Sequence, residues 1–265
     1  MGLHQVAFLE EGTPAFLDHC ARIGVQNCTL VTAALLQPGT VAQTRSRLAT
    51  GGPRVDAVNH PFATFPDLER DTGEAAANLL RAIACAAALG ARWLYVLTGG
   101  RGSLTWEEAA QKFTSLIDAG RAAAAAAGVT LLVENASPFN ADIHIAHTLA
   151  DLIALADIAG IGMCIELHAC WAEADLGRLL RRALPNTGLV QVSDYVLGDR
   201  TAPCRAVPGD GAIPLQRIIG DVLDAGYGGV FDIELVGPRI EAEGARAATE
   251  RAARRVSEIL TGLGA

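Results

Sequence analysis

The chain has 265 residues, a net charge of −8 at pH 7, 51% hydrophobic residues and 19% charged residues. These values predict a folded chain with a sizeable core. The acidic balance argues against a nucleic-acid enzyme, which needs a basic surface to bind phosphates. Only one of the 21 basic residues, Lys112, is a lysine. It falls in a polar helical stretch, so a Schiff-base mechanism is not expected.

No stretch of the sequence is apolar over the roughly 18 positions that a membrane-spanning helix needs. Residues 1–11 lack the basic and apolar segments of a secretory signal. The six cysteines are scattered without a CxxC pair, as expected for reduced thiols. We therefore expect a cytoplasmic protein with neither a membrane nor a nucleic acid as its partner.

Short apolar runs alternate with longer helical patterns along the whole chain. The runs predict strands at residues 3–9, 27–31, 55–59, 93–98, 129–134, 162–166, 189–193 and 229–235. The stretches between them predict helices at residues 14–23, 41–49, 73–89, 106–127, 145–158, 172–184, 215–225 and 241–260. A spacing of about 30 residues is typical of repeated βα units.

A glycine stands before most of the predicted strands, where the preceding helix should end. Glycine adopts the left-handed conformation of a helix C-cap at little cost. We expect this role for Gly24, Gly90, Gly128, Gly160, Gly188 and Gly228.

Eight βα units without a break in composition predict an α/β fold, a single (β/α)₈ TIM barrel over residues 1–265. The alternative is a doubly wound open sheet, which favours a glycine-rich phosphate-binding turn after the first strand. Residues 9–12 follow that strand here, and they are acidic and contain no GxGxxG motif. The barrel is therefore the favoured fold, with its catalytic residues at the carboxyl ends of the strands.

The last four predicted strands carry polar side chains near their carboxyl ends. These are Glu134, Glu166, Gln191 and Glu234. Side chains alternate between the two faces of a strand, so all four can point into the barrel and form one ring. Three carboxylates at a barrel mouth raise one another's pKa, and a divalent cation relieves that repulsion. With the amide oxygen they form an all-oxygen set that suits Mg²⁺ or Mn²⁺ better than Zn²⁺.

Four further side chains are candidates for substrate binding because they follow strand ends. Arg205 offers a fork of donors for a hydroxyl or carboxylate group, and His60 and His168 titrate near neutrality. Trp171 is expected to contribute to an apolar wall together with Phe62, Phe65, Trp106 and Tyr195. For each of them, a purely structural role is the alternative.

Other polar residues are expected to have supporting roles. We expect His4 in the core or at the barrel floor, and His144 and His147 at the surface. Asp194 is expected to orient a neighbouring group. Asp232 should lie one layer below the ring of acids, where it needs a partner if buried.

These motifs, in this order, resemble the xylose-isomerase-like TIM-barrel superfamily of sugar-phosphate isomerases and epimerases. The most specific parts are residues 133–135, 207–211 and 232–234. The resemblance implies one divalent metal ion, Mn²⁺ or Mg²⁺. It also implies which positions of this chain bind the metal and which act as acid and base. The metal ligands would be Glu134, Glu166, Gln191 and Glu234, and Glu134 and Glu234 would also be the catalytic acid and base.

Two of these positions depart from the family pattern. Glu166 stands where aspartate is usual, and Gln191 stands where histidine is usual. Without the imidazole, the site should bind borderline metals more weakly.

The resemblance implies a sugar isomerase or epimerase. Such an enzyme removes a proton next to the carbonyl of a ketose or keto-sugar through a metal-stabilised enediolate. One alternative is a lyase, dehydratase or eliminase that uses the same enolate on a keto-cyclitol or 3-keto-glycoside. A second alternative is a non-catalytic sugar-binding barrel. The expected partner is a small carbohydrate or polyol, and a homo-oligomer is left open.

Overall fold

Eight parallel strands follow one another in chain order around a closed barrel, and β8 pairs with β1. This computed structural model describes residues 1–64 and 66–265. It confirms the predicted (β/α)₈ architecture. The strands are β1 Gly2–His4, β2 Asn27–Val31, β3 Arg54–Pro61, β4 Trp93–Leu97, β5 Thr130–Glu134, β6 Gly162–Glu166, β7 Thr187–Val192 and β8 Val230–Ile233.

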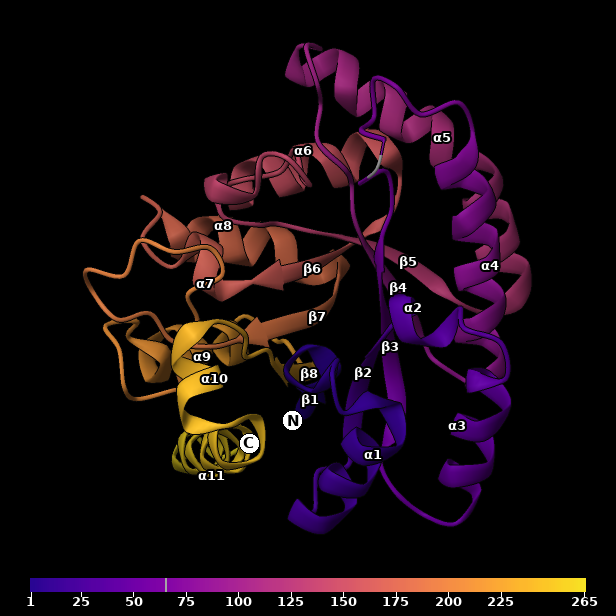
Figure 1. The fold of residues 1–265 in the computed structure, drawn as a ribbon. Coiled ribbons are helices and arrows are strands. Elements are labelled where there is room, and N and C mark those ends of the chain that lie inside the picture. Colours follow the sequence, from indigo (N-terminus) through magenta and orange to yellow (C-terminus); the bar gives the residue numbers. More distant parts are fainter. Residues whose placement is uncertain (65) are drawn as a thin grey trace.

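Helices surround the barrel and bury its outer face (Figure 1). Short 3₁₀ turns at Gln5–Phe8, Pro138–Asn140 and Leu184–Asn186 interrupt the connections. The helices are α1 Gly12–Ile23, α2 Thr32–Leu35, α3 Thr40–Ala49, α4 Glu74–Ala88, α5 Trp106–Ala127, α6 Leu149–Ala159, α7 Leu167–Cys170, α8 Leu176–Ala183, α9 Leu215–Asp224, α10 Pro238–Glu243 and α11 Ala245–Gly262.

A separate layer of side chains fills the barrel interior. Its buried members come from six different strands and are Ala57, Tyr95, Leu132, Cys164, Leu189 and Val230. Because side chains alternate along a strand, residues two or four positions further on face the same interior. Glu134, Glu166, Gln191 and Glu234 are such residues, and this register brings them to the carboxyl-end rim.

The first and last predicted elements differ from those observed. The strand predicted at residues 3–9 ends at His4, because the His4 ring accepts a hydrogen bond from the Val6 N–H and begins a 3₁₀ turn. The helix predicted at residues 241–260 is divided into α10 and α11 at Gly244, whose φ is +89°.

Four of the six predicted glycine caps are observed. Gly24, Gly90, Gly128 and Gly160 all have a positive φ at or just after a helix end. Gly188 instead lies inside β7, where an added Cβ would meet the Trp93 ring at 2.7 Å. Gly226, with a φ of +89°, takes the role predicted for Gly228.

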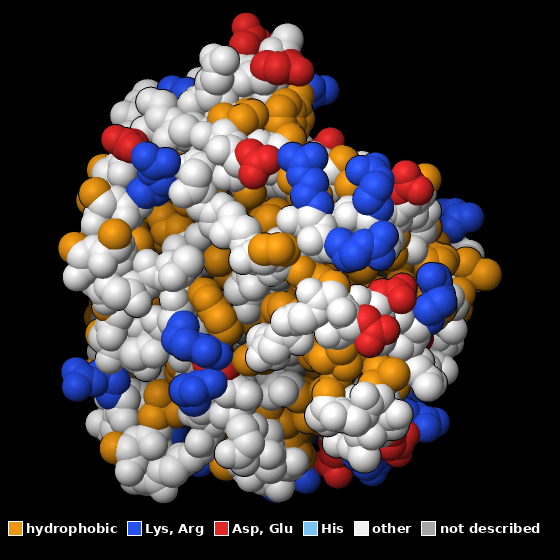
Figure 2. Space-filling view, turned by 180° about the vertical axis from the view of Figure 1, so that it is seen from behind, with side chains coloured by type: hydrophobic (Ala, Val, Ile, Leu, Met, Phe, Trp, Pro, Cys, Tyr) orange, Lys and Arg blue, Asp and Glu red, His pale blue; other side chains and the backbone are white. Residues whose placement is uncertain are grey.

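Most of the arginine side chains lie in ion pairs with carboxylates. Basic and acidic side chains lie beside one another on the face shown in Figure 2. Ion pairs of this kind include Arg182 with Asp157 and Arg251 with Asp210. Among the described helices, none combines the length and apolar character needed to cross a membrane.

Candidate active site

Three carboxylates converge at the rim formed by the carboxyl ends of β5, β6 and β8. One oxygen each of Glu134, Glu166 and Glu234 lies within 4.8 Å of the other two. Glu134 and Glu166 are buried, and Glu234 is partly exposed. The predicted convergence of the three acids is therefore observed.

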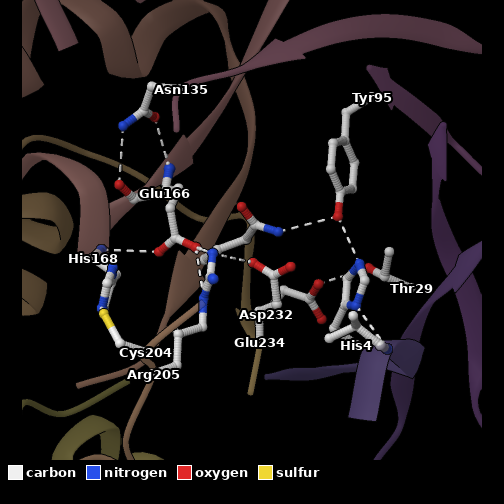
Figure 3. Close-up of polar contacts among 12 residues, drawn as sticks. His4, Thr29, Tyr95, Asn135, Glu166, His168, Cys204, Arg205, Asp232 and Glu234 are labelled. Carbon is white, nitrogen blue, oxygen red and sulfur yellow. Dashed lines mark hydrogen bonds and ion pairs between the residues drawn. The ribbon is translucent and has the colours of Figure 1, made fainter. Parts of the chain in front are cut away.

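The Arg205 guanidinium lies between two of these carboxylates (Figure 3). Its Nη2 donates to Glu234 Oε2 over 2.9 Å. Its Nε donates to Glu166 Oε2 over 3.1 Å, and Nη2 donates to the same oxygen. The second oxygen of Glu166 accepts the His168 N–H over 2.9 Å. Glu166 is therefore held on both oxygens, and Arg205 supplies a fixed positive charge to the cluster.

Burial and mutual repulsion give the carboxylates different protonation behaviour. Burial, with the nearby charges of Glu234 and Glu166, raises the pKa of Glu134 well above its usual range. Burial also raises the pKa of Glu234 to about 8, although Arg205 opposes the shift. Burial alone would raise the pKa of Glu166, but Arg205 lowers it below the usual value. Without a further cation, the cluster therefore retains protons on Glu134 and Glu234 near neutral pH.

The loop between β7 and α9 carries Arg205, and Asp194 holds that loop in place. The buried Asp194 carboxylate accepts backbone N–H groups from Tyr195, Gly209, Gly211 and Ile213 at 2.8–3.0 Å. Position 211 requires glycine, because a Cβ there would lie 2.4 Å from the Asp194 carboxylate. The Asp194 and Ala206 backbones also pair in both directions, which places Arg205 at the rim.

Gln191 lies between β6 and β8 and takes part in a buried polar chain. Its amide nitrogen donates to the Tyr95 hydroxyl over 3.1 Å. The Tyr95 hydroxyl lies 2.7 Å from His4 Nε2, and both side chains are buried inside the barrel (Figure 3). Gln191 Oε1 has no hydrogen-bond partner among the described residues. Nothing in the sequence pattern separated Tyr95 or His4 from ordinary core residues.

The other predicted substrate-binding residues are His168, Trp171 and His60. His168 adjoins Glu166 and packs edge-on against Tyr195. Trp171 follows α7 and is half-buried against the core. His60 is buried, and its Nδ1 lies 2.9 Å from the Thr32 hydroxyl in α2. It does not belong to the group of side chains whose ligand atoms lie within 4.8 Å of one another. Phe65 lies outside the described residues.

Two side chains support the backbone of the catalytic strands. His144, predicted at the surface, is buried instead, and its Nε2 donates to the Glu134 carbonyl over 2.6 Å. The Asn135 side chain pairs with both the N–H and the C=O of Glu166, at 2.9 and 3.1 Å. These contacts join residues distant in sequence, so no local pattern indicated them.

Asp232 lies inside the barrel below the acidic cluster. Its Oδ2 accepts the Thr29 hydroxyl over 2.7 Å, which supplies the partner that burial was expected to require. Burial raises the pKa of Asp232 to about 7, although the Thr29 hydrogen bond opposes that shift.

A small cavity adjoins the cluster. It has a volume of about 40 Å³ and is lined by Glu166, His168 and Arg205 together with loop residues 136, 137, 139, 140 and 201–204. This is above the roughly 10–15 Å³ that one ordered water molecule needs in a cavity. A sugar needs space beyond this cavity.

The family model described as a xylose isomerase-like TIM barrel matches residues 17–258. No functionally curated protein has a significant sequence match to this chain. The solved structure of SMc04130 from Sinorhizobium meliloti 1021 is 22% identical, with a TM-score of 0.80 over 99% of this chain and 95% of that one.

Two further solved structures have similar folds. The IolI protein with a bound zinc atom is 16% identical, with a TM-score of 0.84 over 99% of this chain and 98% of that one. D-psicose 3-epimerase with D-tagatose, from Clostridium cellulolyticum H10, is 14% identical, with a TM-score of 0.74 over 99% and 97%. At these identities the likeness concerns the fold alone.

Proposed function

The chain belongs to the xylose isomerase-like TIM barrel family, and we propose that it is a divalent-cation-dependent sugar isomerase or epimerase. The substrate would be a ketose or keto-sugar that loses a proton next to its carbonyl. The observation that carries the proposal is the convergence of three carboxylates from β5, β6 and β8 within 4.8 Å.

The charges and donor atoms of this cluster fit a hard divalent cation. Three ionised carboxylates and one guanidinium leave a formal charge of −2, three negative against one positive, which one divalent cation neutralises. The donors are carboxylate oxygens, with Gln191 Oε1, which is buried and has no hydrogen-bond partner among the described residues, as a fourth. Mn²⁺ and Mg²⁺ prefer such oxygen ligands.

Glu134, Glu166, Gln191 and Glu234 would hold the cation. When bound, it would stabilise the negative charge that develops on substrate oxygens as the proton leaves. Gln191 replaces the usual histidine, but the number of carboxylates in the cluster is unchanged. The replacement is therefore consistent with a retained cation site.

The three glutamates have different contacts, and these differences indicate different roles. Glu166 is fixed on both oxygens by Arg205 and the His168 N–H, so we assign it to binding and orientation. The Glu134 carboxylate has no recorded hydrogen bond from the described residues. Glu234 uses one oxygen for Arg205. Each of these two retains an oxygen that can accept a proton, and they approach the site from different strands. We therefore assign the acid and base roles to Glu134 and Glu234.

Proton exchange with solvent tests this function directly. Purified protein with Mn²⁺ is incubated in D₂O with free ketoses and with 3-keto-glycosides, and the products are followed by ¹H NMR. We expect deuterium at the carbon next to the carbonyl and a second sugar, with loss of both after chelation. Loss of a leaving group would identify the lyase alternative. The absence of exchange with every substrate would support the non-catalytic alternative.

A further inference from the structure

The hydrogen bonds around Tyr95 determine which atom of the Gln191 amide remains free. His4 Nδ1 accepts the Val6 N–H over 3.0 Å, so this nitrogen carries a lone pair and no proton. A neutral imidazole then carries its proton on Nε2. His4 Nε2 therefore donates to the Tyr95 hydroxyl, which lies 2.7 Å away.

The Tyr95 hydroxyl oxygen accepts from two sides. His4 donates from β1, and the Gln191 amide nitrogen donates from β7 over 3.1 Å. This direction of donation holds the nitrogen end of the Gln191 amide at Tyr95.

The oxygen end of the amide is consequently left on the opposite side. Gln191 is in register with Glu166 on β6 and with Asp232 on β8, and Glu234 follows directly after β8. Gln191 is fully buried, and its Oε1 has no hydrogen-bond partner in the described part of the chain. An amide oxygen beside carboxylates is repelled by them unless a cation lies between, so this orientation favours a cation at the site.

We infer that His4 and Tyr95 are positioning residues that turn the Gln191 amide oxygen toward the carboxylate cluster and so complete its oxygen ligand set. Neither residue has to touch the cation or the substrate. The inference rests on the proposed function, because it concerns the same cation. Residues of β1 and β4 would then affect the cation affinity although they do not bind the cation.

Mn²⁺ binding to the full chain, measured by titration calorimetry without substrate, tests this role. Tyr95→Phe removes the acceptor and frees the amide to rotate. We expect it to weaken Mn²⁺ binding by about 10- to 100-fold, as loss of a group that orients a ligand typically does. Tyr227→Phe is the matched control, because the Tyr227 hydroxyl hydrogen-bonds the Gly188 and Val230 carbonyls at the amino ends of β7 and β8, away from the acids. It should bind Mn²⁺ like the wild-type protein.

A double mutant separates positioning from a general structural effect. In a Gln191→Ala background, Tyr95→Phe should cause no further loss of affinity, because the group that it positions is gone. An equal loss in both backgrounds would overturn the inference. So would wild-type affinity, or tighter binding, in Tyr95→Phe alone. Tighter binding would mean that Tyr95 holds the oxygen end of the amide away from the cation.

His4→Leu provides a second variant if Tyr95→Phe does not fold. Without its hydrogen bond to His4, the Tyr95 hydroxyl is held on one side only, so it no longer fixes the Gln191 amide in one orientation. We expect weaker Mn²⁺ binding, and unchanged affinity would contradict the inference. If the wild-type protein binds no Mn²⁺, the proposed cation site fails and this inference fails with it. If the wild-type protein binds Mn²⁺ and the variants bind it equally well, the cation site is supported and the positioning role is contradicted.

Discussion

Arg205 Nη2 lies 2.9 Å from Glu234 Oε2, and this ion pair joins the β7–α9 loop to the end of β8. The same guanidinium also binds Glu166, so one side chain from a long loop links two acids of the barrel rim. Arg205 was a candidate for substrate binding from its sequence position. Its observed contacts are with the acids themselves, which makes it part of the charge balance of the site.

Arg205→Gln should destabilise the metal-free protein, because the buried Glu166 carboxylate loses its counter-charge and Glu234 loses a hydrogen-bond donor. Removing one partner of a buried ion pair costs about 3–5 kcal/mol of unfolding free energy. Mn²⁺ should restore part of that loss, which urea unfolding with and without Mn²⁺ would measure. Arg239→Gln is the control, because its pair with Asp199 lies at the solvent-exposed surface and contributes little to stability. Equal losses in the two variants would contradict the charge-balancing role.

Glu134→Gln and Glu234→Gln should each suppress exchange of the substrate proton with D₂O while the fold is retained. Each change keeps the side-chain shape and removes a group that can accept a proton. Loss of a general acid or base typically lowers the rate by about 10²–10⁴-fold. Exchange is measured by ¹H NMR and folding by circular dichroism, with the exposed Glu258→Gln as control. Normal exchange in both active-site variants would remove them from the acid and base roles.

Gln191→His should shift the preference of the site toward zinc. An imidazole is a better ligand for Zn²⁺ than an amide oxygen, whereas Mg²⁺ prefers oxygen. The ratio of Zn²⁺ to Mg²⁺ affinity should therefore rise, and competition titrations would show it. An unchanged ratio would mean that Gln191 does not bind the cation.

Asp194→Ala should loosen the loop that carries Arg205. Four backbone N–H groups lose their acceptor, and a buried donor left without a partner costs about 1–3 kcal/mol. We expect lower unfolding free energy and lower kcat/KM together. Asp194→Asn retains one acceptor oxygen and should have a smaller effect on both. If the alanine variant is as stable as the wild type, Asp194 does not hold the loop.

The contribution of His19 to stability should fall as the pH is lowered from about 6.5 to about 4. Burial, assisted by Arg22, lowers the pKa of this imidazole to about 4, whereas the unfolded chain binds the proton near pH 6.5. Within this window the unfolded state holds more protons at His19, so this group favours unfolding in acid, by up to about 1.4 kcal/mol per pH unit.

His19→Gln should flatten that pH dependence. The glutamine amide can replace the hydrogen bond to Thr249 without binding a proton. Urea unfolding at several pH values between 4 and 7 measures the slope for both proteins. His4, His60 and His144 shift in the same direction, so part of the slope should remain. Identical slopes would show that His19 does not contribute.

Several features of the site followed from periodicity alone. Strand β6 was predicted with its observed bounds, and alternation along β5 to β8 placed Glu134, Glu166, Gln191 and Glu234 on the interior face. The helix at residues 106–127 was also predicted correctly, with Gly128 marking its end, and in the structure the Thr105 side chain caps its start. These features depend on neighbours in sequence, which a single chain displays directly.

The missed features depend on contacts between distant residues. His144 resembled a surface residue because nothing near it in sequence shows that the Glu134 carbonyl needs its donor. The first strand was predicted too long because the apolar run continues past His4, where the side chain captures the Val6 N–H.

The amino-acid sequence by itself determined the barrel, the strand ends at which acids stand and the faces to which they point. Such properties follow from side-chain periodicity and from the handedness of the βα connections. Only the tertiary structure decided that Arg205 binds two of the acids and that Tyr95 holds Gln191. These pairings join side chains 39 and 96 positions apart in the chain, and their energies exist only once the barrel has closed around them.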